Sequence, residues 1–305
     1  MDKDIARIGA FRYVAVEKHI LARIESGELS PGDKIPSLRA LGARLGVSVS
    51  TIGQAYLELE RQPRQVSRNT LIRQVLDTMG RDDILPFGVA KTGEELLPAK
   101  ALARIMTQVV RGNPEASLRY ETVAGNERLR RQIALRCLDA GAEVTAADVL
   151  ITAGALEALF IAVRAVTRAG DNVVIAAPAY NSVQHILEYQ GLRAIEVPTG
   201  PQCGVNPSDL ASILRKFDVK ACILTPNFNN PDGALMSEGA KREIVAMLAE
   251  RDIPLIEDDV YGEMHYGPKR PPLMKSFDEK GLVLTCSSFS KTLSAGYRVG
   301  WILPG

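Results

Sequence analysis

The chain has 305 residues, of which 46% are hydrophobic and 24% are charged, and its formal net charge is +1. These proportions are those of an ordinary soluble globular protein, and the length allows two domains with a sizeable core. So small a net charge excludes a bulk attraction to nucleic acid, and any contact with DNA must therefore come from a local patch.

The cysteines, histidines and apolar stretches exclude several other classes of protein. The four cysteines show no CxxC spacing and the three histidines lie far apart in the sequence. We therefore expect no metal site, no disulfide framework and a reducing, cytoplasmic location. The charged N-terminus has no signal-peptide apolar region. The most apolar stretch, Val149 to Val166, contains Glu157 and Arg164, which argues against a membrane span.

Residues 1–62 have the pattern of a small all-α domain. Phe11 to Ile24 is predicted to form an amphipathic helix. A second helix, Leu38 to Leu45, has Ser37 as its N-cap and ends at Gly46, and a third runs roughly from Ser50 to Glu60. Two helices joined by a short turn have the layout of a helix-turn-helix, whose second helix enters the major groove of DNA. Spacing alone leaves a plain three-helix bundle open.

The particular residues of this segment favour the helix-turn-helix over the plain bundle. Residues 24–60, IESGELSPGDKIPSLRALGARLGVSVSTIGQAYLELE, closely resemble the N-terminal DNA-binding domain of GntR-type regulators. The resemblance implies double-stranded operator DNA as a partner, with the basic side chains on phosphates and those from Ser48 onward at the groove. The candidate contacts are Lys34, Ser37, Arg39, Arg44, Ser48, Ser50, Thr51 and Gln54.

The chain departs from the GntR pattern in two places. The family commonly has an arginine where this chain has Val49. After the third helix the family continues into a short β-hairpin, the wing, whereas here Leu59-Glu60-Arg61 passes directly into Gln62-Pro63-Arg64-Gln65 without a hairpin signal. Either the wing is lost or the sequence skips residues. We place a linker at residues 63–98, with a short helix predicted over Thr70 to Met79.

From residue 99 to residue 305, short apolar runs alternate with helical patterns. Such alternation predicts an α/β domain whose mostly parallel sheet is covered on both faces, with ligands at the carboxyl ends of the strands. The predicted strands are Val149–Thr152, Val173–Ala176, Ala194–Val197, Ala221–Thr225, Pro254–Glu257, Leu282–Cys286 and Val299–Leu303.

One lysine near the end of the chain carries the most distinctive chemistry. Lys291 stands among small hydroxyl residues between two apolar strands. Partial desolvation there favours the neutral, nucleophilic amine, which suits Schiff-base chemistry. Ser288, Ser290 and Arg298 supply two hydroxyl donors and a bidentate cation for one phosphate. For this loop alone, a surface loop with a solvated lysine remains an alternative.

Other strand ends carry groups that a flat, anionic cofactor would need. Gly154 precedes a helix whose N-terminal N–H groups form an anion site, and Tyr180 presents an aromatic ring. Side-chain amides gather around Asn230. The carboxylates of residues 257–259 follow an apolar strand, where burial is costly unless a cation or a donor such as a pyridinium N–H answers them.

These motifs, in this order, resemble the fold type I pyridoxal-phosphate enzymes of the aspartate aminotransferase class over residues 85–305. The resemblance implies pyridoxal 5'-phosphate bound covalently to Lys291, with Asp258 pairing the pyridine nitrogen and Tyr261 and Asn230 donating to the phenolic oxygen. Tyr180 is implied to stack on the ring. The implied phosphate cradle is Gly154, Ala155, Leu156, Ser288, Ser290 and Arg298.

The same resemblance implies a homodimer, because Tyr120 matches a tyrosine that reaches the phosphate of the neighbouring subunit. In the cradle, relatives often have side-chain donors where this chain has Ala155-Leu156, so backbone N–H groups alone serve there. Aminotransferases of this class continue into a small C-terminal domain that holds the substrate carboxylate. The chain stops at Gly305 without it, so we expect a longer protein.

A GntR-like DNA-binding domain, here called the reader, fused to an aminotransferase-like domain is the arrangement of the MocR subfamily of bacterial regulators. The resemblance implies a transcriptional regulator whose large domain, residues 99–305, senses pyridoxal phosphate or a small amino compound. Two alternatives stay open. One is a working aminotransferase with an incidental N-terminal module, and the other is a GntR-type reader whose large domain is only a dimerisation scaffold.

Overall fold

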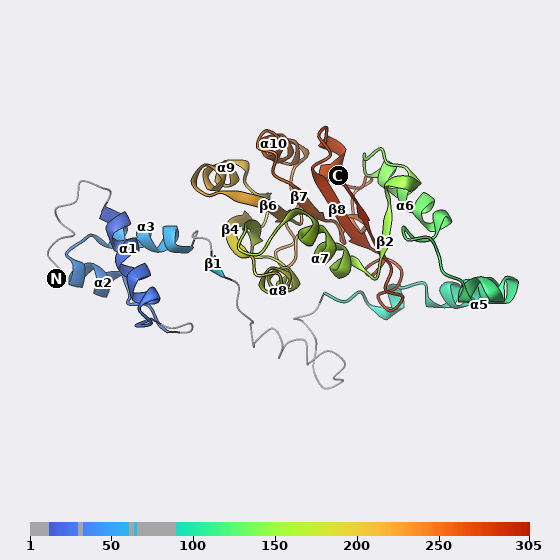
Figure 1. Cartoon of the computed structure of the whole chain (residues 1–305), viewed down its shortest axis with the longest axis horizontal. Helices are drawn as coiled ribbons and strands as arrows, with labels where there is room; N and C mark the ends of the chain where they lie inside the picture. The colour runs from blue at the N-terminus through green and yellow to red at the C-terminus, as the bar shows by residue number, and fades with distance from the viewer. Residues whose placement is uncertain (1–11, 30–32, 61–63, 66–89) are drawn as a thin grey trace. The chain divides into compact units, whose positions relative to one another are not determined.

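The structure, a computed structural model, describes residues 12–29, 33–60, 64–65 and 90–305. Two compact units divide the chain, one within residues 1–63 and one within residues 64–305 (Figure 1). The helix predicted over residues 70–79 lies outside the described residues. Among the helices that are described, none is both long and apolar enough to cross a membrane.

The first unit contains the three predicted helices, α1 (Arg12–Glu25), α2 (Leu38–Leu45) and α3 (Val49–Glu60). Ser37 caps α2, since its hydroxyl accepts the backbone N–H of Ala40 at 3.3 Å. Gly46 ends α2 in the left-handed conformation, with φ 66°. The helices bury a small apolar core of Val16, Ile20, Leu41, Leu45, Ile52 and Ala55.

The second unit is built on a sheet that has nine strands in the described residues, in the order β1-β4-β3-β6-β7-β8-β9-β2 with β5 beside β4. Strands β4, β3, β6, β7 and β8 are mutually parallel, as predicted, whereas β9, β2 and β1 pair antiparallel to their neighbours. The strands are β1 (Arg64–Gln65), β2 (Leu150–Thr152), β3 (Asn172–Ala177), β4 (Arg193–Gly200), β5 (Gly204–Val205), β6 (Val219–Leu224), β7 (Leu255–Asp258), β8 (Val283–Ser288) and β9 (Gly300–Leu303).

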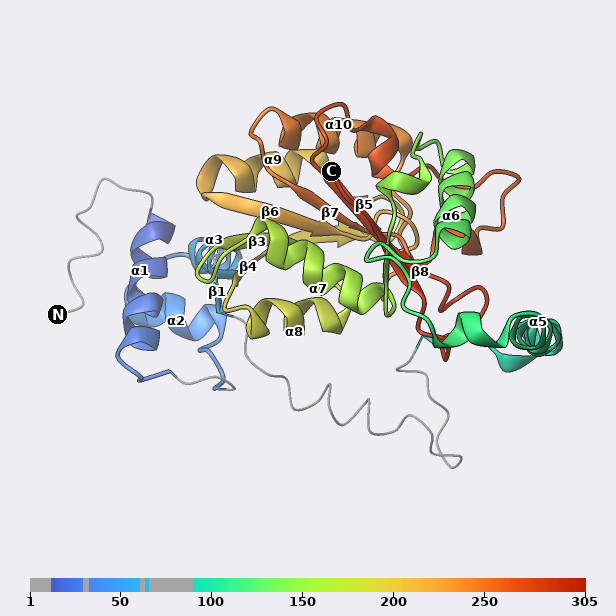
Figure 2. The ribbon, with the colours of Figure 1, turned by 45° about the vertical axis from the view of Figure 1, so that its right-hand side comes forward.

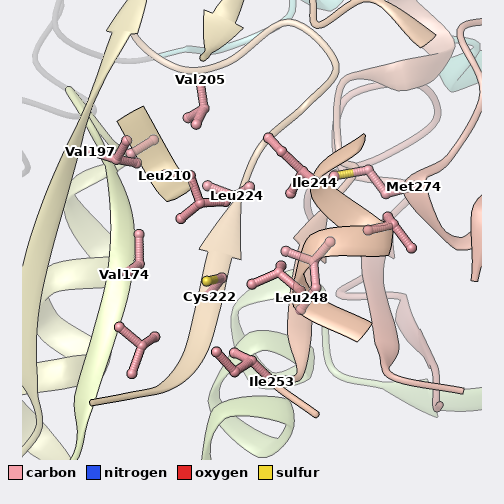
Figure 3. Close-up of a cluster of buried hydrophobic side chains, with 14 of the residues drawn as sticks. Val174, Val197, Val205, Leu210, Cys222, Leu224, Ile244, Leu248, Ile253 and Met274 are labelled. Atoms are coloured by element: carbon pink, nitrogen blue, oxygen red, sulfur yellow. The ribbon is translucent and has the colours of Figure 1, made fainter. Parts of the chain in front are cut away.

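Helices cover both faces of this sheet. Successive residues of a strand point to opposite faces, and both sets are apolar here, so each face needs a covering layer. Val173 and Ile175 of β3 pack with α7 and α8, whereas Val174 of the same strand packs with α9 and α10. Figure 2 shows these two layers, and Figure 3 shows the apolar cluster on the α9–α10 side. The helices of this unit are α5 (Ala99–Gly112), α6 (Glu127–Asp139), α7 (Ala155–Val166), α8 (Asn181–Tyr189), α9 (Pro207–Lys216) and α10 (Glu238–Ala249).

A close backbone approach fixes the start of α7 against the sheet. Gly300 begins β9 and pairs with Ser288 of β8. A Cβ atom added to Gly300 would lie 2.7 Å from both Gly154 Cα and Ala155 N, which is closer than real Cβ atoms come to backbone. Because Gly300 has no side chain, the N-terminus of α7 and the end of β8 are brought together.

Gly300→Ala is therefore expected to lower the free energy of unfolding by about 1–3 kcal/mol, because the backbone at Gly154 must shift to admit the methyl group. Gly112→Ala, at the open end of α5 where an added Cβ meets nothing within 4 Å, is the matched control and should cost nothing. Urea unfolding of both variants measures the difference. Equal stabilities would contradict the close approach.

Candidate functional site

The candidate cofactor site lies where the carboxyl ends of β6, β7 and β8 meet the N-terminus of α7. Asp258 is the last residue of β7 and pairs in register with Cys286 of β8. Lys291 follows β8 in a turn, and Asn230 lies in the loop after β6. Strand order alone brings together residues that are far apart in the sequence.

Asp258 has a buried carboxyl group with an unmet hydrogen bond. Its side chain is 3% exposed, and its Oδ1 atom has no hydrogen-bond partner. Burial, aided by the neighbouring charge of Asp259, raises the pKa of Asp258 to about 7, against the opposing effects of the Val260 N–H group and Lys291. Buried polar atoms are almost always satisfied, so this oxygen is suited to a donor or cation that comes from outside the chain.

Lys291, the predicted nucleophile, is half-buried. Its ammonium group donates to the carbonyl of Ala90 at 2.5 Å and lies 5.6 Å from the centre of the Tyr261 ring. Burial lowers the pKa of Lys291, and the charge of Asp258 partly opposes this shift. The lowered pKa increases the fraction of neutral amine, as predicted for a partly desolvated lysine. The Thr92 hydroxyl also donates to the Lys291 carbonyl at 2.9 Å.

Tyr261 and Asn230 form a hydrogen-bonded pair beside the lysine. Asn230 Nδ2 donates to the Tyr261 hydroxyl oxygen at 3.1 Å. Burial raises the pKa of Tyr261 to about 12, so the phenol keeps its proton and can donate it in a hydrogen bond. Tyr180 precedes α8 with its side chain 38% exposed, and it lies close enough to contribute to the raised pKa of Tyr261.

The predicted phosphate cradle is assembled around Gly154. This glycine has φ 97° and directly precedes α7, so Ala155 and Leu156 belong to the first turn, whose backbone N–H groups point out of the helix. Arg298 donates to the Ala153 carbonyl at 3.2 Å, and a Cβ atom on Gly154 would overlap its guanidinium group. A side chain at residue 154 would thus fill the space that the arginine occupies.

The two serines of the cradle belong to the same corner of the sheet. Ser288 is buried, and its hydroxyl accepts the backbone N–H of Ser290 at 3.3 Å. Ser288 pairs with Gly300, which in turn touches Gly154. Arg298 has φ 51°, an unusual conformation for a residue with a side chain. Such strain is often found where a side chain must be aimed at a ligand.

Behind the site lies a charged network that sequence reasoning missed. Asp259 accepts from Arg270 and, at 2.8 Å, from Asn227 Nδ2. The fully buried Lys241 donates to Asn227 Oδ1 at 2.6 Å and to the Pro272 carbonyl at 2.8 Å. Arg270 and Asn227 of this chain therefore satisfy Asp259, one of the three carboxylates for which the sequence required a cation or a donor. The sequence does not mark Lys241 as buried, because α10 also carries other charged residues and a lysine on such a helix is usually solvated.

Glu257 is also satisfied within the chain. Its carboxylate accepts the Met274 N–H at 2.7 Å and the Thr285 hydroxyl at 2.8 Å. Of the three consecutive acids at the end of β7, Asp258 is the one left with an unpartnered oxygen. Asn227 also joins the loop after β6 to the end of β7, which holds Asn230 beside Tyr261.

In the first unit, the predicted DNA contacts divide into two groups. Ser37 and Ser48 cap helices, and the Ser48 hydroxyl accepts the Thr51 N–H at 3.1 Å while it bonds the hydroxyls of Ser50 and Thr51. One proton and two lone pairs of the Ser48 hydroxyl are thereby engaged within the chain, so a contact with a base would exchange one of these hydrogen bonds. All of the predicted contact side chains are exposed except that of Thr51, which is half-buried, and Lys34, Arg39, Arg44, Ser50 and Gln54 form the group that does not cap a helix.

In the same unit, Gln54 Nε2 donates to Glu58 at 3.0 Å, which fixes the orientation of the Gln54 amide.

In the second unit, Tyr120 is fully exposed, so its ring does not pack against the candidate cofactor site of its own chain. In the part of the chain that the structure describes, no group of three potential ligands gathers to bind a metal ion.

Comparisons with known proteins show which families this chain resembles. Residues 88–304 match the family Aminotransferase class I and II, and residues 12–63 match the bacterial regulatory proteins of the gntR family. The HTH-type transcriptional regulators YjiR and YdcR of Escherichia coli are 34% and 33% identical, and the alignments cover 96% of this chain and 69% of each regulator. The YjiR alignment spans 325 positions, more than this chain has residues, so YjiR carries segments that this chain lacks.

A solved structure extends the comparison. LysN, an α-aminoadipate aminotransferase of Thermus thermophilus complexed with N-(5'-phosphopyridoxyl)-L-leucine, is 29% identical with a TM-score of 0.69. The match covers 79% of this chain and 60% of LysN. Fold and comparisons together define a helix-turn-helix reader fused to an aminotransferase domain. The chain belongs to the MocR-type regulators of the GntR family.

The raised pKa of Asp258 predicts a pH-dependent stability in the ligand-free protein. Because its folded-state pKa, about 7, exceeds the ordinary aspartate value of about 3.9, ionisation destabilises the folded state as the pH rises between these values. The stability of Asp258→Asn relative to the wild type should therefore rise by up to about 4 kcal/mol between about pH 4 and pH 8. Urea unfolding at several pH values measures this. A difference that does not vary with pH would contradict it.

Proposed function

We propose that this chain is a transcriptional regulator that binds pyridoxal 5'-phosphate in its second unit and operator DNA through α2 and α3. The observation that carries the cofactor proposal is the unpartnered Oδ1 atom of buried Asp258, beside a lysine whose pKa burial lowers. The residues present fit this cofactor, because each of its polar groups finds a complementary group at the site.

Pyridoxal phosphate supplies an aldehyde that condenses with a primary amine and an aromatic ring that withdraws electrons. Lys291 supplies the amine, and Asp258 supplies the carboxylate oxygen that accepts the N–H of a protonated ring nitrogen. Tyr261 and Asn230 donate to the ring oxygen, and Tyr180 covers the ring. The N–H groups at the start of α7, with Ser288, Ser290 and Arg298, hold the dianionic phosphate.

Occupancy of this site is proposed to change DNA binding. Lys291 contacts Ala90 and Thr92, which follow β1 and residues 66–89 in the chain. A lysine amine that binds a ligand covalently changes its hydrogen bond to the Ala90 carbonyl. We propose that this change is passed along the chain toward the DNA-binding unit.

Lys291→Ala is expected to abolish the near-visible absorbance band that wild-type protein gains with pyridoxal phosphate. Lys269→Ala, a change at an exposed lysine, should leave the band intact. Footprinting on DNA upstream of the protein's own gene should differ with and without cofactor for the wild type, but not for Lys291→Ala. If the wild type gains no absorbance band, the second unit does not bind the cofactor through an imine, and the hypothesis of a dimerisation scaffold remains. Steady turnover of an amino donor and a keto acid without any DNA binding would establish an aminotransferase instead.

We further propose a homodimer formed through α5. None of the residues of α5 is buried, although the helix is strongly amphipathic, and it lies to one side of the sheet in both views (Figures 1 and 2). Exposed apolar surface of this kind marks an interface. A second copy of the chain would cover it and would bring Tyr120 to the partner's phosphate cradle. The exposed apolar side chains of α5 include Ile105, Met106, Val109 and Val110.

Val109→Glu is expected to shift the protein from dimer to monomer, because a carboxylate would have to be buried in the interface. Gln108→Glu adds the same charge at an adjacent exposed residue on the polar side of α5 and is the control. Sedimentation velocity distinguishes the two. A dimer that survives Val109→Glu would exclude α5 from the interface.

A further inference from the structure

In the described part of the first unit, neither a close contact nor the backbone conformation requires a glycine at position 53, in the middle of α3. Other described glycines of this unit have such a requirement. Gly27 and Gly46 have φ values of 77° and 66°, and a Cβ atom on Gly42 would lie 2.9 Å from the Val47 carbonyl oxygen. At Gly53 an added Cβ would meet nothing within 4 Å, and the backbone is helical. Because glycine destabilises a helix relative to alanine, the absence of a side chain at Gly53 calls for an external reason.

Half-buried Gly53 lies between two exposed apolar side chains on one uncharged stripe of α3. Val49, Gly53 and Leu57 follow one another at intervals of four residues and so share one face of α3. Val49 is 46% exposed and Leu57 is 51% exposed. The opposite face carries Ile52 and Ala55, which are fully buried in the core.

The charges around the stripe favour DNA as the molecule that covers it. α3 contains Glu58 and Glu60 but no lysine or arginine, so the stripe itself cannot be a phosphate site. Exposed Arg39 and Arg44 lie on α2, the helix that crosses the DNA backbone in a helix-turn-helix. Cations on α2 beside an uncharged stripe on the next helix suit a groove, where phosphates border the base edges.

Resting on the proposed DNA binding, we infer that the stripe Val49–Gly53–Leu57 meets the floor of the major groove. Gly53 lets the axis of α3 approach the base edges more closely than a helix with a side chain there. Val49 then contacts the C5-methyl group of a thymine, the one apolar group that base pairs display in this groove. This chain reads a methyl group where GntR relatives commonly present an arginine.

The thymine contact is tested with uracil, which lacks only the C5-methyl group. Duplexes are first selected by the full-length chain from a random-sequence library, and each thymine is then replaced in turn by uracil. Wild-type protein should lose about fourfold in affinity at one thymine of each half-site, the equivalent of one methyl group removed from water. Val49→Ala should bind the thymine and uracil duplexes equally at that position.

The close approach is tested with Gly53→Ala on the same selected duplex. We expect a loss of affinity of about tenfold or more, because the added methyl group enters a closely packed contact. Amide hydrogen exchange in α1–α3 should be unchanged or slower, which shows that the reader is folded. Gly239→Ala makes the same chemical change at an exposed position of α10, where an added Cβ would meet only the Ser237 hydroxyl oxygen at 4.0 Å, and it should bind DNA as the wild type does.

Several outcomes overturn the inference. Undiminished DNA affinity in Gly53→Ala, or a uracil scan that is flat or identical for Val49→Ala, would remove the stripe from the groove. If Gly53→Ala lost the dimer in sedimentation velocity while each DNA-binding unit kept its affinity for DNA, the stripe would be assigned to a contact between proteins. If the wild type selects no sequence at all, the proposed DNA binding itself fails, which is distinguishable from failure of the stripe alone.

Discussion

The alternation of side chains along β7 is the constraint on which the site depends. Glu257 and Asp259 point to one face of the strand, where Thr285, Asn227 and Arg270 satisfy them. Asp258 points to the other face, where its Oδ1 atom has no partner. Three acidic residues in a row are thus divided into a structural pair, stabilised by donors and cations of the same chain, and one carboxylate whose Oδ1 atom has no partner. A shift of one residue in the register would exchange these roles.

The structural pair also serves the ligand side of the strand. Asn227 bonds both Asp259 and Lys241, and so connects the loop after β6 to the end of β7 and to α10. That connection keeps Asn230 within hydrogen-bond distance of Tyr261. A buried polar network satisfied at every member favours one arrangement of the loops, whereas removing one member leaves a buried charge unanswered. The geometry of the site therefore depends on residues that never touch a ligand.

Local sequence signals made much of the fold and part of the candidate site predictable. The caps at Ser37 and Gly46, the alternation of apolar runs with helices, and the position of Lys291 between strands are encoded within a few residues. Long-range partners were not predictable, because nothing near Lys241 marks it as buried, and Ala90 and Lys291 are about two hundred residues apart. The antiparallel direction of β9 likewise depends on how a turn closes. A role at the groove stays a prediction for Ser48, whose hydroxyl accepts the Thr51 N–H group at the start of α3.

A carbon-13 NMR titration of the Asp258 carboxyl group, assigned by its loss in Asp258→Asn, tests the central claim most directly. Without cofactor, the carboxyl should titrate near neutral pH, because burial raises its pKa to about 7. With pyridoxal phosphate bound, it should stay ionised across that range, because the ring N–H then supplies the missing partner. A pKa in the ordinary range near 4 without cofactor, or a titration that the cofactor leaves unchanged, would contradict the account.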